Sequence, residues 1–129
     1  MAIYFAATDL QAQQHLSAVI SDAAFARYSE MARHVTGQSW LTWPLQYPVS
    51  WSMIRGYDAV DYVADISPLP LLLIHSEDDR IVPYANNGKL LRAALPPKTF
   101  LKTRGLHTAT FNDEENRNYL LDYLAQIAK

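Results

Sequence analysis

The chain lacks cysteine altogether, which excludes disulfide bonds and thiolate metal sites from its 129 residues. An excess of charge is missing too. The formal net charge is −2, and no run of Lys and Arg supplies the field that attracts nucleic acid or an anionic membrane. The longest apolar run, residues 69–74, is far too short to cross a bilayer. No basic segment precedes an apolar one at the start, so no signal peptide is expected. These absences predict a cytoplasmic protein with no nucleic-acid or membrane partner.

Three apolar segments indicate strands in a chain whose residues are half apolar and 19% charged, as in a typical globular domain. Residues 70–75 form a continuous apolar run of the kind that is buried on both faces of a parallel sheet. Residues 98–103 alternate like a strand nearer an edge, and residues 16–20 indicate a short third strand. Helical patterns flank these strands at residues 2–8, 23–35, 84–95 and from 112 onward. The alternation predicts one α/β domain, residues 1–129, with about three parallel strands and flanking helices.

An aromatic-rich segment, residues 36–57, is interpreted as a small lid. It contains all three tryptophans and two prolines but few charges. Its aromatic side chains either line an acyl pocket, cover a core or form a partner surface, and the sequence does not choose among these roles. The residues concerned are Trp40, Trp43, Tyr47 and Trp51.

Chemically useful side chains follow two of the predicted strands. Asp78 and Asp79 come after the strand that ends at His75, and His107 comes after the next strand. Since parallel strands end at one edge of a sheet, an acid and a histidine in these positions can meet there. A carboxylate that accepts from one imidazole nitrogen leaves the other nitrogen free to act as a base.

Residues 70–83, read as PLLLIHSEDDRIVP, resemble the last-but-one strand and acid turn of the α/β-hydrolase superfamily, serine peptidase/esterase type. That pattern is a strand running into His-Gly-x-x-Asp, followed by Val-Pro, and it places the acid on Asp79. Ser76 stands where the family usually has glycine. Gly105-Leu-His107 is similar to the family's Gly-x-His loop, which places the base on His107. The resemblance covers nearly the whole chain but only the C-terminal half of the family's fold, and it implies catalytic roles for Asp79 and His107.

The nucleophile of that family is absent from the sequence. The family carries its serine in a Gly-x-Ser-x-Gly elbow, and the four glycines here form no such motif. The resemblance places the elbow, and the loop that supplies the oxyanion donors, before residue 1. It therefore implies a parent that hydrolyses ester or peptide bonds and a chain that is inactive alone. No cofactor is expected, and the implied ligand is a small acyl group or peptide.

The sequence offers two alternatives to this site, a metal cluster and a replacement nucleophile. A metal cluster would use the side chains of His75, Asp78, Asp79 and His107, but their spacing matches no recognisable metal-ligand pattern. We interpret His75 as a structural histidine and Asp78 as a solvated turn residue. Ser39 follows half an elbow, but no strand precedes it.

A further candidate is Asp22, at the end of the first predicted strand. It is either an alternative acid or, as we favour, the N-cap of the following helix.

In the fold that the resemblance implies, the first strand, from Leu16 to Ser21 (residues 16–21), pairs on its inner side with the strand that carries the elbow, so this side has no partner within the chain. An apolar strand with unpaired backbone groups invites pairing with another chain. We therefore expect a homo-oligomer that assembles through this edge or through the first helix. This expectation supports a second reading, a homodimeric binding or assembly module built on the truncated fold.

Overall fold

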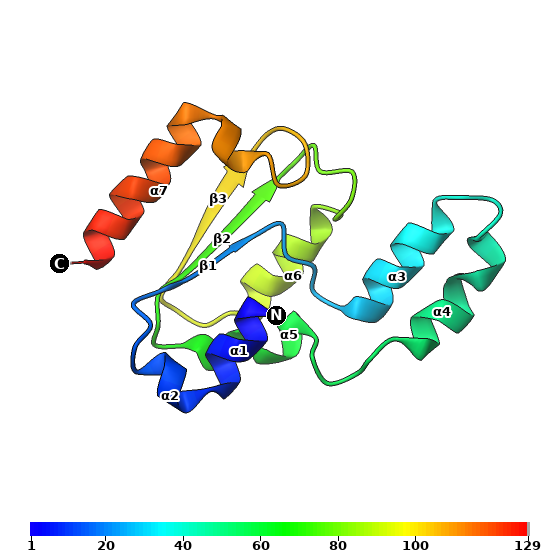
Figure 1. Cartoon of the computed structure of the whole chain (residues 1–129), viewed down its shortest axis with the longest axis horizontal. Helices are drawn as coiled ribbons and strands as arrows, with labels where there is room; N and C mark the ends of the chain where they lie inside the picture. The colour runs from blue at the N-terminus through cyan, green and yellow to red at the C-terminus, as the bar shows by residue number, and fades with distance from the viewer. Residues whose placement is uncertain (129) are drawn as a thin grey trace.

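The sheet has three parallel strands in the order β1–β2–β3, as Figure 1 shows for the computed structural model, which describes residues 1–128. The strands are β1 (Val19–Asp22), β2 (Leu71–Ser76) and β3 (Lys98–Thr103). Leu71 of β2 pairs with Val19 on one side and with Lys98 on the other. The predicted α/β class with three parallel strands is confirmed. The first strand begins at Val19, three residues later than expected.

All six residues of β2 are buried, as the continuous apolar run predicts. Helices α1 (Ala2–Thr8), α2 (Leu10–Gln13), α5 (Ala59–Tyr62) and α6 (Ala85–Ala93) lie on one face of the sheet, and α7 (Glu114–Ile127) lies on the other (Figure 1). The main core forms on the first of these faces, where Leu71 and Leu73 pack with side chains from the helices and β1. The largest of these partners are Ile3, Val19, Val63, Ile66 and Leu90.

Short helical turns complete the body of the fold. They are η2 (Val63–Ile66), which follows α5, and η3 (Thr110–Asn112), which precedes α7. The last helix begins where the sequence predicts, because Asp113 accepts hydrogen bonds from the backbone N–H groups of Glu115 and Asn116. Among residues 1–128, no helix combines the length and the apolar character that crossing a membrane requires.

The predicted lid forms part of a two-helix arm, residues 28–52, that projects from the body (Figure 1). The arm consists of α3 (Tyr28–Gly37), η1 (Trp43–Leu45) and α4 (Gln46–Ser52). The four aromatic side chains singled out in the predicted lid do not cover a core, because all four are exposed, Trp40 by 87%. The others are Trp43, Tyr47 and Trp51.

The root of the arm differs from the sequence expectation. Helix α3 begins at Tyr28, five residues later than predicted, because the chain leaves β1 through Ala23 in the left-handed region, at φ 53°. The expectation that Asp22 caps this helix is therefore wrong. Asp58, thirty residues further along, accepts the Tyr28 N–H at 2.8 Å instead. Arg27 is held by ion pairs to Asp58 at 3.2 Å and to Asp61 at 2.7 Å.

Candidate active site

Asp79 lies in the turn that follows β2, with its side chain fully buried. Its Oδ1 accepts the backbone N–H groups of Ile81 at 2.8 Å and of Val82 at 3.0 Å. His75, in β2, also contacts this turn, and its buried ring places Nε2 3.0 Å from the carbonyl oxygen of Val82. A carbonyl only accepts, so this nitrogen carries the proton, and His75 has the structural role expected of it. These hydrogen bonds define the conformation of the turn.

His107 meets Asp79 from the loop after β3. Its Nδ1 lies 2.7 Å from Asp79 Oδ2, the carboxylate oxygen that the turn leaves free. The loop reaches this position through two left-handed residues, Gly105 at φ 111° and Thr108 at φ 58°. The His107 side chain is 27% exposed, and its Nε2 has no hydrogen-bond partner among residues 1–128. The structure therefore brings together the two residues that the sequence singles out and leaves one imidazole nitrogen open to a ligand.

The electrostatics of the pair favour a charged Asp79. Burial raises the pKa of Asp79, but the hydrogen bond to His107 and those from Val82 and Ile81 lower it, and the net shift of the pKa is downward. An ionised carboxylate only accepts hydrogen bonds, so the shared proton lies on His107 Nδ1 at neutral pH. In the neutral ring Nε2 is then the unprotonated nitrogen, as a general base requires.

Ser76 connects the acid turn to the histidine loop. Its Oγ donates to the carbonyl oxygen of Gly105 at 2.6 Å and accepts the N–H of Asp78 at 3.1 Å. Asp78 is exposed, as predicted, yet its Oδ2 accepts the Gly105 N–H at 3.2 Å. From the sequence alone, Ser76 stands out only as a departure from the family's glycine. The signal in the sequence that could have revealed this role is a hydroxyl residue at the end of a strand predicted to be buried.

The other candidates lie elsewhere. Ser39 is exposed at the turn between the two helices of the arm, and no strand leads into it (Figure 1). Asp22 ends β1, and its buried Oδ1 has no partner among residues 1–128. Within the same part of the chain, no group of three or more His, Cys, Asp or Glu side chains is arranged to hold a metal ion.

Comparison with curated proteins gives relatives of much greater length. The uncharacterized protein YfhR of Escherichia coli K12 is 30% identical over 117 residues, covering 87% of this chain and 37% of YfhR. YfhR of Salmonella typhi is 28% identical over 87 residues, covering 67% of this chain and 26% of that protein. The chain thus spans about a third of the length of the curated relatives it matches. No protein-family model matches it.

Solved structures match nearly the whole chain. The esterase domain of a Rhodothermus marinus protein has a TM-score of 0.63 at 18% identity, covering 98% of this chain and 54% of its own. MGS-MChE2, an α/β hydrolase from a lagoon-sediment metagenome, has a TM-score of 0.66 at 15% identity, covering 99% and 57%. At these identities the likeness concerns the fold.

The role of Ser76 gives a first prediction. Ser76→Ala leaves the Gly105 carbonyl without its donor, so we expect a loss of about 1–3 kcal/mol in the free energy of unfolding, measured by urea denaturation. We also expect the NMR signal of the His107 Nδ1 proton to broaden as the loop loosens. Thr103→Val is the matched control, because the Thr103 hydroxyl is buried at the end of β3 and has no hydrogen-bond partner among the described residues 1–128. Equal effects of the two variants would contradict the positioning role.

The lowered pKa of Asp79 gives a pH prediction. Because this pKa lies below its value of about 3.9 in the unfolded chain, the ionised carboxylate stabilises the fold above that pH. The contribution is lost as pH falls through the folded-state pKa. We expect Asp79→Asn to be destabilising at pH 7, with a difference from the wild type that shrinks as pH falls below about 4. Asp78→Asn is the exposed control, and a difference independent of pH for Asp79→Asn would refute the assignment.

Proposed function

Because the chain has part of the α/β-hydrolase fold, we propose that Asp79 and His107 are the acid and base of a serine hydrolase that cleaves ester or peptide bonds. The observation that carries the proposal is the 2.7 Å contact between Asp79 Oδ2 and His107 Nδ1. Its position after two neighbouring parallel strands is where reactive groups gather in open α/β sheets. Both residues follow their strands in the order acid then histidine, as in α/β-hydrolases.

The proposed chemistry assigns each atom a task. Asp79 holds the Nδ1–H tautomer of His107, so Nε2 takes the proton of a serine hydroxyl as its oxygen bonds to the substrate carbonyl carbon. The resulting imidazolium, stabilised by Asp79, returns that proton to the leaving group when the acyl bond breaks. A water molecule then repeats the two steps on the acyl-enzyme, releasing the acid and restoring the serine.

The serine itself would come from residues outside these 129. The sequence contains no Gly-x-Ser-x-Gly motif, and acyl transfer needs both the activated serine and donors for the oxyanion. We infer that the 129-residue chain is catalytically silent by itself. The nucleophile would belong to a longer form of the protein or to a second chain.

An apolar pocket of about 600 Å³ offers a place for the acyl group of a substrate. It lies between the start of α1 and the segment that follows α4, within the size range of small-molecule sites. Its lining is almost entirely apolar or aromatic and consists of Met1, Tyr28, Ser52, Met53, Ile54 and Tyr57.

The base role of His107 predicts its tautomer. In ¹⁵N-correlated NMR spectra we expect the neutral ring of His107 to carry its proton on Nδ1 and none on Nε2, because the ionised Asp79 only accepts. Asp79→Asn should abolish this preference, whereas Asp78→Asn should keep it. A protonated Nε2 in the wild-type neutral ring would exclude His107 as the base.

Labelling with a fluorophosphonate tests the inference that the 129-residue chain has no reactive serine. After treatment with a fluorophosphonate, we expect the intact mass of the 129-residue chain to be unchanged. A single adduct that disappears in His107→Ala would show that these residues do contain a working serine, and peptide mapping would locate it.

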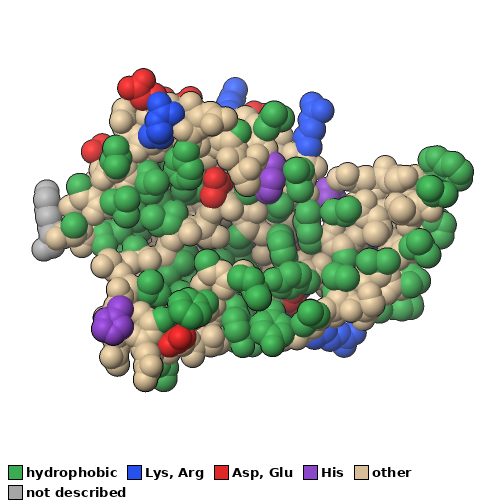
Figure 2. Space-filling view, viewed as in Figure 1, with side chains coloured by type: hydrophobic (Ala, Val, Ile, Leu, Met, Phe, Trp, Pro, Cys, Tyr) green, Lys and Arg blue, Asp and Glu red, His purple; other side chains and the backbone are tan. Residues whose placement is uncertain are grey.

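A second candidate function is a homodimeric assembly module. The N–H groups of Val19 and Ala23 donate to Pro70 and Ile74 of the β2 segment at 2.8 and 2.9 Å. Because the ladder alternates, the N–H groups of Ile20 and Asp22 point away from β2, toward the free edge. Figure 2 shows apolar side chains gathered on the surface that contains this edge, between α1 and α7. An unpaired edge with apolar surroundings favours strand pairing with a second copy.

Dimer formation predicts a doubled mass in sedimentation equilibrium. Ile20→Pro should give the monomer mass, because proline removes only the outward N–H of this strand. Ile20→Val, which keeps that N–H, should remain dimeric. A wild-type protein that stays monomeric over the whole concentration range would exclude the assembly function, without bearing on Asp79 and His107.

A further inference from the structure

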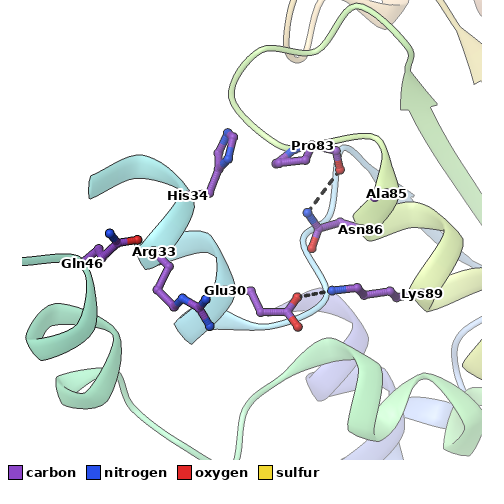
Figure 3. Close-up of a pocket in the computed structure, with 8 residues that line it drawn as sticks. All are labelled: Glu30, Arg33, His34, Gln46, Pro83, Ala85, Asn86 and Lys89. Carbon is purple, nitrogen blue, oxygen red and sulfur yellow. Dashed lines mark hydrogen bonds and ion pairs between the residues drawn. The ribbon is translucent and has the colours of Figure 1, made fainter. Parts of the chain in front are cut away.

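A pocket of about 450 Å³ lies between helix α3 of the arm and helix α6 of the body (Figure 3). Pro83, at the end of the turn that carries Asp79, forms one wall. The remaining lining is rich in charged and polar groups: Glu30, Arg33, His34, Gln46, Asn86 and Lys89. We propose that this pocket binds the carboxylate group of a small organic acid. The site does not depend on the proposed hydrolase function.

Arg33 is the residue that would hold the carboxylate. Its guanidinium carbon lies 5.3 Å from the centre of the Tyr47 ring, a cation–π contact that orients the side chain from the other helix of the arm. Among residues 1–128 it forms no ion pair and donates no side-chain hydrogen bond. The planar guanidinium presents paired donors that match the two oxygens of a carboxylate.

The charge of the pocket suits a monoanion. Lys89 Nζ lies 2.6 Å from Glu30 Oε2, so these two charges compensate each other (Figure 3). Arg33 then leaves the pocket with one net positive charge, which one carboxylate neutralises. A phosphate dianion would leave an excess negative charge beside the Glu30 carboxylate, which is unfavourable.

His34 supplies a second donor. Its Nε2 lies 2.9 Å from the side-chain nitrogen of Gln38, an amide group that only donates. The ring of His34 therefore accepts at Nε2 and carries its proton on Nδ1. In Figure 3 the ring projects from α3 into the space between the arm and Pro83. A neutral N–H there adds a hydrogen bond for an anion without adding charge.

Asn86 fixes the body side of the pocket. Its Oδ1 accepts the N–H of Ala26 at 3.1 Å, and its Nδ2 donates to the carbonyl oxygen of Pro83 at 3.2 Å. The buried amide thereby ties α6 to the segment that leads into the arm and to the acid turn. A pocket whose wall is already held in place loses less entropy when a ligand binds.

Calorimetric and NMR titrations of the 129-residue chain with benzoate test the proposal. Benzamide is the neutral probe of the same shape, and inorganic phosphate is the dianionic probe. We expect benzoate to bind and to shift the amide signals of residues 30–34 and 84–89, with binding of benzamide and phosphate at least about tenfold weaker. That ratio corresponds to about 1.4 kcal/mol.

Variants separate Arg33 from the general charge of the surface. Arg33→Gln should weaken benzoate binding at least about tenfold, a loss of about 1.4 kcal/mol. Arg92→Gln removes an exposed charge from the last turn of α6, outside the pocket, and should leave binding unchanged. Glu30→Gln should strengthen binding and bring phosphate into range. Equal binding of benzoate and benzamide, or full binding by Arg33→Gln, would overturn the proposal.

Discussion

The carboxylate of Asp79 is the group on which the arrangement at the sheet edge depends. Its two oxygens have separate partners, because the turn's own N–H groups occupy Oδ1 and His107 occupies Oδ2. Burial alone would favour the protonated acid, whereas these hydrogen bonds favour the ion. The contact links two loops that follow different strands. A change in the conformation of either loop therefore alters the positions of both Asp79 and His107.

The parts of the molecule that local patterns encode were predictable. Strand β2 is read from a run of apolar residues, and the acid turn and histidine loop follow strands that end at the same edge. Their meeting requires only that the strands be parallel neighbours, which the α/β pattern implies. Asp113 likewise caps the last helix through bonds to residues two and three positions away. In each case the determining contacts are short in sequence or follow from the sheet.

What the sequence did not reveal depends on distant contacts. Helix α3 starts late because its first N–H is satisfied by Asp58 and not by a residue before it. The link from Ser76 to Gly105 joins positions 29 residues apart. The exposure of Trp40 and its aromatic neighbours follows from the projection of the arm, which periodicity within residues 36–57 does not encode. Local propensity carries no information on any of these pairings.

The root of the arm has a consequence for how the molecule responds to its surroundings. The Arg27 guanidinium at the start of the arm pairs with two carboxylates of the body, those of Asp58 and Asp61, and Arg27 and Asp61 both remain substantially exposed. Mobile ions screen such exposed attractions over about 8 Å at physiological ionic strength and over less in stronger salt. Added electrolyte thus weakens this joint selectively while leaving the apolar core intact. The ionic strength of the solution therefore contributes to how firmly the arm is attached.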